Sequence, residues 1–132
     1  AESLARIFDR ITAALPDRVE VAPRDLLARV SFGSDSPATV APEILTAVAE
    51  AVSANSVLEL TYRPLGRSQA TKYTVNPYLL RRARGAWYLV ARDRHRGHVP
   101  MFHLSRIESA RATGATFDYD AAGFDPKAYF AS

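Results

Sequence analysis

The feature that most constrains the fold is a series of short segments with period-two alternation that begins at residue 57. Leu58, Leu60 and Tyr62 alternate with polar residues, which is typical of a strand with one buried face. The same pattern predicts strands over 57–63, 71–75, 86–91, 99–104 and 107–112, separated by breaks at 64–67, 76–77, 84–85 and 96–97. Five short strands joined by tight turns favour a small β-barrel, because closure protects the edges of a sheet.

Helical periodicity precedes these strands. Apolar residues at helical spacing predict an amphipathic helix over 2–15 that ends at Pro16. Pro42 and Glu43 open a second helix that runs to about Ser53, since Pro and an acid both suit a helix start. A helical turn over 25–30 and a loop over 31–39 lie between them. The expected class is therefore α+β, with N-terminal helices followed by a five-stranded barrel.

The length of 132 residues fits one domain, and the chain has no cysteine, which excludes disulfides and thiolate metal sites. No apolar run reaches the roughly 18 residues that a membrane span needs, so we expect a cytoplasmic protein without a membrane partner. The sequence lacks an initiating Met and opens within a helical pattern. We therefore expect the chain to be a piece of a longer protein.

The positive charges of the chain are concentrated in its middle. Residues 1–61 have a balance of −4 and residues 112–132 one of −2, whereas residues 62–111 carry eleven Lys or Arg against two acids, a balance of +9. Such a segment creates a positive potential that attracts phosphate groups. The alternative is a solvated basic surface that keeps the protein soluble.

Residues with catalytic potential are few. His95 and His98 fall in an expected hairpin tip, and no nucleophile elbow or phosphate-cradling glycine loop is present. Three histidines scattered among arginines do not supply a zinc site. We expect no enzyme activity, catalytic residue, metal or cofactor, although a histidine-assisted nuclease remains an alternative.

Aromatic residues are interleaved with the arginines of the basic block. Arginine binds phosphates through two parallel hydrogen bonds, and aromatic faces stack unpaired bases. Trp87 and Phe102 are expected to be core residues, whereas Tyr62 at a strand end could serve either role. The pattern favours a binding surface for an oligonucleotide or another phosphorylated molecule.

Four landmarks in order resemble the WYL domains of bacterial transcriptional regulators. In chain order they are the strand Leu58 to Arg63, Pro77 ten residues before Trp87, the triplet Trp87-Tyr88-Leu89, and the run Phe102-His103-Leu104-Ser105-Arg106-Ile107. The resemblance covers roughly residues 42–118. It implies linker helices and a loop over 1–41, an effector-sensing barrel with its leading helix over 42–118, and the start of a C-terminal extension over 119–132.

The resemblance also implies an Sm-like, SH3-type barrel that binds a nucleic-acid-like effector such as single-stranded DNA. Family members are often homodimers, and they bind promoter DNA through a helix-turn-helix domain. We expect this domain and most of the extension to be missing from this sequence. Occupancy of the sensor would shift a conformational or dimer equilibrium, which requires the ligand to bind one state better than the other.

The family's basic pocket is carried over to residues that match its motifs: Tyr62, Arg94, His103 and Arg106. His103 stands where the family often has Arg, Ser105 where it often has Asp, and Pro100 where the closing motif usually begins with Arg. Arg92 and Arg96 are the neighbouring cations that could compensate, and they complete the predicted ligand-binding set. The alternative reading is a dimerisation module that has lost its effector.

Overall fold

The computed structural model describes residues 18–21 and 40–131. The helix expected over 2–15, the turn over 25–30 and the loop over 31–39 lie outside the described residues. The described elements are, in chain order, β1 (Val19–Val21), α3 (Pro42–Ala54), β2 (Ser56–Tyr62), β3 (Thr71–Ala83), β4 (Ala86–Asp93), β5 (Met101–His103), the 3-10 turn η2 (Leu104–Arg106), β6 (Ile107–Thr116), α4 (Tyr119–Ala122) and α5 (Pro126–Tyr129).

Helix α3 confirms the expectation from Pro42 and Glu43, which occupy its first turn. It ends at Asn55, whose φ of 54° is left-handed and whose N–H donates to the carbonyls of Ala51 and Val52. Asn tolerates this conformation better than most residues, so the helix stops where the chain turns into β2.

The sheet has the strand order β5-β4-β3-β2-β6, with all neighbours antiparallel, and β1 pairs in parallel with the second half of β3. Strand β3 was expected to end at Asn76-Pro77 but continues to Ala83. The predicted strand end at Pro77 was wrong. The ladder to β4 shifts register between Pro77 and Leu79, and this irregularity accommodates a residue without an N–H. Strand β6 also runs four residues beyond its expected end, to Thr116.

The α+β class, with a helix followed by five antiparallel strands, is confirmed, but the sheet is not a closed barrel. Among the described residues, no ladder joins the edge strands β5 and β6. The three-residue η2 nevertheless carries the chain from one edge to the other, so the two ends of the curved sheet meet. There, the N–H of Arg63 donates to the carbonyl of Arg106 at 3.0 Å.

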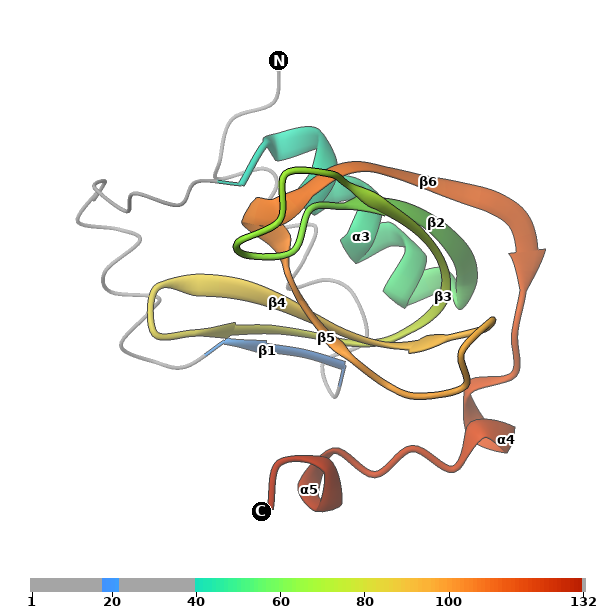
Figure 1. Ribbon diagram of the computed structural model, residues 1–132. Coiled ribbons are helices and arrows are strands. Elements are labelled where there is room, and N and C mark those ends of the chain that lie inside the picture. Colours follow the sequence, from blue (N-terminus) through green and yellow to red (C-terminus); the bar gives the residue numbers. More distant parts are fainter. Residues whose placement is uncertain (1–17, 22–39, 132) are drawn as a thin grey trace.

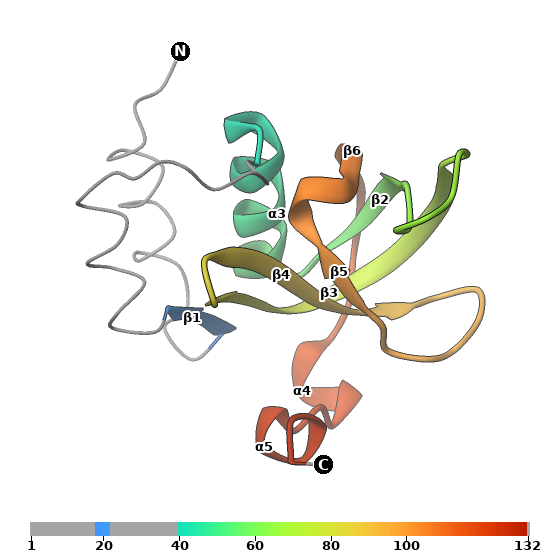
Figure 2. The same ribbon diagram turned by 60° about the vertical axis from the view of Figure 1, so that its left-hand side comes forward.

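Alternation along the strands gives the sheet two faces, the inner face toward α3 and the outer face opposite it. The inner core includes Leu58, Leu60, Val75, Leu80, Leu89 and Phe102, packed with Leu45, Val48 and Val52 of α3. On the outer face, Tyr78, Leu79 and Val90 lie under the C-terminal segment, residues 117–131. Figures 1 and 2 show α3 on one side of β3 and β4, and α4 and α5 on the other.

Candidate functional site

Three side chains form a row across neighbouring strands on the outer face. Tyr88 of β4 is the register partner of Arg81 on β3 and of His103 on β5. The preceding row, Leu80, Leu89 and Phe102, belongs to the inner core, so the residues one position along point outward. The rings of Tyr88 and His103 lie 5.0 Å apart at 66°. We call Arg81, Tyr88 and His103 the outer row.

The two-residue turn between β3 and β4 sets the register of this row. Arg84 and Gly85 both have positive φ, 54° and 76°. A two-residue hairpin loop of type I′ requires positive φ at both positions. The turn pairs Ala83 with Ala86, which places Arg81 opposite Tyr88.

His103 is held in place at three points. Its backbone N–H donates to the hydroxyl of Tyr62 at 3.1 Å, and its Nδ1 lies 2.8 Å from Ser105 Oγ. Its ring contacts Tyr88. Burial and the positive charge of Arg106 lower the pKa of His103 from 6.5, so the ring is neutral at pH 7. The ring is thus a fixed donor and acceptor beside a cation.

Arg106 lies in η2, is half-buried, and forms no ion pair within the part of the chain that the structure describes. Arg106 follows His103 by three residues, and its positive charge contributes to the lowered pKa of that ring. An arginine without a carboxylate partner can bind a phosphate without first breaking an ion pair.

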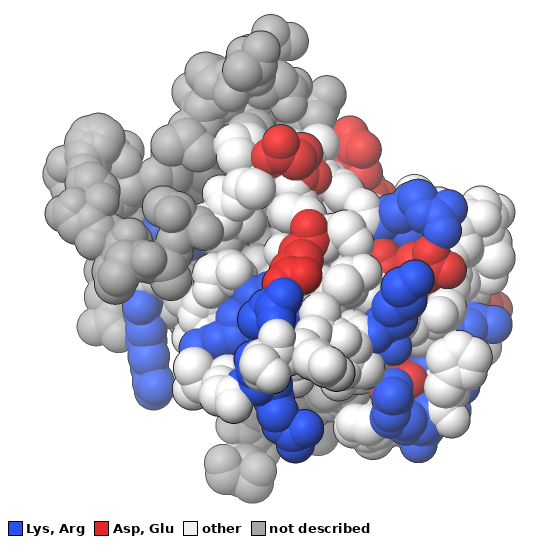
Figure 3. Space-filling model, turned by 45° about the horizontal axis from the view of Figure 1, so that its top comes forward, with Lys and Arg blue, Asp and Glu red and all other residues white. Residues whose placement is uncertain are grey.

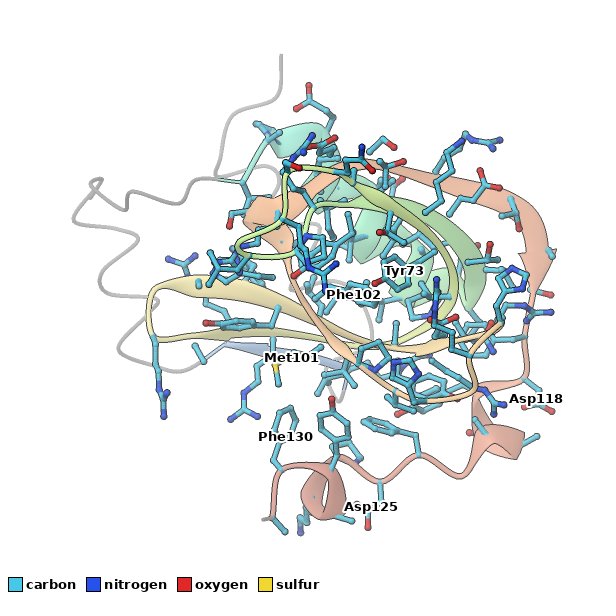
Figure 4. The ribbon with its side chains drawn as sticks, viewed as in Figure 1. Tyr73, Met101, Phe102, Asp118, Asp125 and Phe130 are labelled. Atoms are coloured by element: carbon cyan, nitrogen blue, oxygen red, sulfur yellow. The ribbon has the colours of Figure 1, made fainter. Side chains whose placement is uncertain are left out.

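Tyr62 and Arg96 belong to a different environment, on the inner face. The rings of Tyr62, Tyr73 and Phe102 pack edge to face, with centroids 5.0, 5.1 and 6.2 Å apart. The guanidinium of Arg96 lies 4.8 Å from the centroid of Tyr73 and donates to Asp93 at 2.9 Å. Figure 4 shows Tyr73 and Phe102 within the curve of the sheet and Phe130 on its other side. We call the rings of Tyr62, Tyr73 and Phe102 the aromatic trio.

Arg92 and Arg94 lie at the far end of the outer face. Arg92 is the register partner of Asn76, and Arg94 donates to Asn76 Oδ1 at 2.9 Å. Val90, covered by the C-terminal segment, separates them from Tyr88 along β4. The structure therefore places His103 in the outer row, with Arg106 three residues after it. Tyr62 belongs to the aromatic trio, and Arg96 packs against that trio. Arg92 and Arg94 lie further along the outer face.

The charges of the basic block are partly compensated. Arg63 pairs with Glu108 at 2.6 Å, Arg111 pairs with Glu59, and Arg96 pairs with Asp93. Figure 3 shows Lys and Arg in several groups on one surface of the molecule, with acidic side chains between them. On the face shown, acidic side chains thus divide the positive charge into separate groups.

Two residues of this region were absent from the predicted set. Arg81 could have been found from the Arg84-Gly85 turn, because a two-residue loop fixes which residues face each other. Asp93 organises the β4–β5 loop by accepting from the backbone N–H groups of His95 and Arg96 at 3.0 and 3.1 Å. Its side chain is fully buried, a state that no sequence pattern indicated.

The described residues, 18–21 and 40–131, contain neither a cluster of metal ligands nor a helix fit to span a membrane. No group of three or more His, Cys, Asp or Glu residues there is arranged to hold a metal ion. No helix of this part of the chain has the length and apolar character that a membrane crossing requires.

Comparisons with known proteins give one consistent result. A family model described as WYL domain matches residues 43–112, which span α3 and most of the sheet. Protein PafB of Mycobacterium tuberculosis and that of Mycobacterium bovis are each 30% identical to the chain over 92 residues, covering 67% of it. A solved structure of proteasome accessory factor B/C (PafBC) of Arthrobacter aurescens matches with a TM-score of 0.57 and 31% identity, covering 74% of the chain.

The matched proteins are much longer than the region they share with this chain. The chain spans 28% of the length of the two PafB proteins and 16% of the PafBC chain. The comparisons therefore concern one domain of those proteins.

Proposed function

The chain belongs to the WYL domain family, and on this basis we propose that it is the effector-sensing part of a bacterial transcriptional regulator. The ligand is an oligonucleotide or another phosphorylated molecule, bound at the outer row together with Arg106. The family resemblance supports the regulatory role, and the similarity to PafB and PafBC agrees with it. The domain acts by binding and not as an enzyme.

The observation that carries the proposal is the outer row itself, with Arg106 in η2 three residues after His103. Arg106 has no carboxylate partner among the described residues, and His103 beside it is a neutral hydrogen-bonding group. Tyr88 offers a half-buried ring in the same row, on which an unpaired base can stack. A cation, a neutral donor and an aromatic ring are the groups that recognise a phosphorylated nucleotide.

The remaining parts of the proposal follow from the family. The curved sheet is an open version of the Sm-like, SH3-type barrel, in which η2 joins the two edges. The full-length protein is a cytoplasmic homodimer that binds promoter DNA through a helix-turn-helix domain. Tyr62 and Arg96 support the site from the inner face, since the hydroxyl of Tyr62 holds the backbone of His103. Arg92 and Arg94 lie further along the outer face, beyond the covered Val90, so we place the ligand at the outer row instead.

Fluorescence anisotropy with a labelled single-stranded oligonucleotide tests this proposal. Two forms, with and without a 5′-phosphate, are titrated at about 50 and about 200 mM salt, because phosphate contacts release counterions and weaken with salt. A nucleoside monophosphate serves as competitor to distinguish an oligonucleotide site from a mononucleotide site. We expect salt-sensitive binding that Arg106→Ala weakens about tenfold.

The matched control is Arg67→Ala, which removes the same charge from an exposed residue of the β2–β3 loop. Arg67→Ala should leave the affinity within about twofold of the wild type, because a distant exposed charge is screened by salt. Equal losses in the two variants would mean that only net charge matters. Absence of binding by every phosphorylated probe at low salt would refute the sensor proposal itself.

A further inference from the structure

Arg18 is a buried arginine immediately before β1, with only 1% of its surface exposed. Its side chain donates to groups that lie 37 to 60 residues further along the chain. A guanidinium is costly to remove from water unless its donors are satisfied, so this burial requires all of these partners. The site described above makes no use of it.

Two of these partners lie on one edge of β3. Strand β2 pairs with this edge as far as Val75, and β1 pairs with it from Leu80 onward. The intervening stretch contains the register shift after Pro77. Arg18 Nη2 donates to the carbonyl of Pro77 at 2.9 Å, and its Nε donates to that of Tyr78 at 3.0 Å. Arg18 thus supplies donors where neither strand does.

The third partner is the C-cap of α3. Arg18 Nη1 donates to Oδ1 of Asn55, the left-handed residue that ends the helix. The carbonyl of the same Asn55 accepts from the N–H of Phe117 at 3.0 Å, at the start of the C-terminal segment. Asn55 therefore connects Arg18 to that segment through one residue.

The C-terminal segment also contacts Arg18 directly. Arg18 Cζ lies 3.6 Å from the centroid of the Tyr119 ring, within the range of a cation–π contact. The Tyr119 ring in turn packs on Tyr78 at 5.8 Å. One guanidinium therefore donates in its plane to β3 and α3, and it stacks through its face on the C-terminal segment.

Only arginine combines these contacts, because its planar fork has five donors and an exposed face. A lysine has a point charge that cannot reach three directed acceptors and stack on a ring at once.

We infer that Arg18 couples β1 to the C-terminal segment. Through it, β1, the end of α3, the irregular part of β3 and residues 117–119 form one cooperative unit. Coupling is reciprocal, so release of the C-terminal segment loosens β1 and loss of β1 loosens the segment. β1, which precedes α3 in the chain, and the C-terminal segment, which follows β6, are thereby linked.

A role in signalling rests on the proposed function. The guanidinium of Arg81, in the outer row, lies 4.0 Å from the centroid of Phe130 in the C-terminal segment. A ligand at the outer row that displaces Phe130 would change how this segment, through its Tyr119, packs on Arg18. The coupling itself needs no ligand, so its test is independent of the sensor proposal.

Hydrogen–deuterium exchange of the whole chain without ligand tests the coupling. Arg18→Met removes the donors, Tyr119→Leu removes the ring, and the double variant measures whether the two effects add. Arg94→Met is the matched control, because it also removes an arginine bonded to an Asn Oδ1, at an exposed position. Arg18→Met should speed exchange at least about tenfold in peptides covering both 19–21 and 117–131.

Tyr119→Leu should speed exchange in 19–21 as well, and the double variant should exchange little faster than Arg18→Met alone. Arg94→Met should leave both peptides unchanged. Should Arg18→Met fail to fold, exchange is measured on Arg18→Lys instead, and we expect smaller increases in the same two peptides. Faster exchange in 19–21 alone, or additive effects in the double variant, would overturn the coupling.

Discussion

Asp93 gives the most quantitative prediction, because its carboxylate is fully buried and accepts three hydrogen bonds from the loop that follows it. Its Oδ1 accepts from two backbone N–H groups, those of His95 and Arg96, and its Oδ2 accepts from the exposed guanidinium of Arg96. Two amide bonds to a charged acceptor contribute about 1 to 1.5 kcal/mol each. Asp93→Ala should therefore lower the free energy of unfolding by about 2 to 3 kcal/mol.

Urea unfolding at pH 7, followed by the fluorescence of Trp87, measures this change. With a slope of about 2 kcal/mol per molar urea, the midpoint should fall by about 1 M. Asp93→Asn keeps an acceptor oxygen, so it should cost about half as much. A midpoint shift below about 0.2 M in Asp93→Ala would refute the claim that this carboxylate holds the loop.

The pH dependence provides a second readout for Asp93. Burial acts to raise its pKa, but the hydrogen bonds from Arg96 and the His95 amide outweigh burial and lower the pKa below 3.8. A carboxyl whose pKa is lower in the folded state stabilises the protein above its unfolded pKa, and this stability is lost on acidification below about pH 4. The Asp93→Asn variant should therefore lose less stability on acidification than the wild type does. Identical acid profiles would contradict the assignment.

Three further predictions concern the core, the C-terminal segment and the outer row. Val52→Ala, in a residue with 0% exposure, should cost about 2 kcal/mol in urea unfolding, whereas Ser53→Ala on the exposed face should cost less than about 0.5 kcal/mol. Tyr129→Phe removes the hydroxyl that donates to Val99 O at 2.9 Å and should lower stability by about 1 kcal/mol in the same assay; burial raises the pKa of Tyr129, so its titration should lie above pH 10. Because the pKa of His103 is lowered from 6.5 by burial and by Arg106, oligonucleotide binding should strengthen on acidification below pH 6.5, as the ring gains a charge, and His103→Gln should abolish that gain.

The elements with strong local signals were predictable from the sequence. Pro42 and Asn55 mark the two ends of α3, and the Arg84-Gly85 turn marks the hairpin between β3 and β4. Strand β3 was predicted too short because Pro77 reads as a strand breaker. Whether Pro breaks a strand depends on the register with the neighbouring strand, and here the shift before Leu79 accommodates it.

The candidate site was less predictable, because charge counts do not say on which face of a sheet a residue lies. The C-terminal segment covers Val90 and so divides the outer face between Tyr88 and Arg92. Tyr62 and His103 are in contact, yet their rings lie on opposite faces, since only a hydroxyl and a backbone N–H join them. The Arg18 contacts span 37 to 60 residues and have no local signal.

The central claim is that a phosphorylated ligand binds at the outer row and Arg106. The most direct measurement is a backbone amide NMR titration of the chain with a 5′-phosphorylated oligothymidylate at low salt. We expect saturable shifts centred on Arg81, Tyr88, His103 and Arg106. Shifts confined to Arg92 and Arg94, or to the aromatic trio, would contradict it.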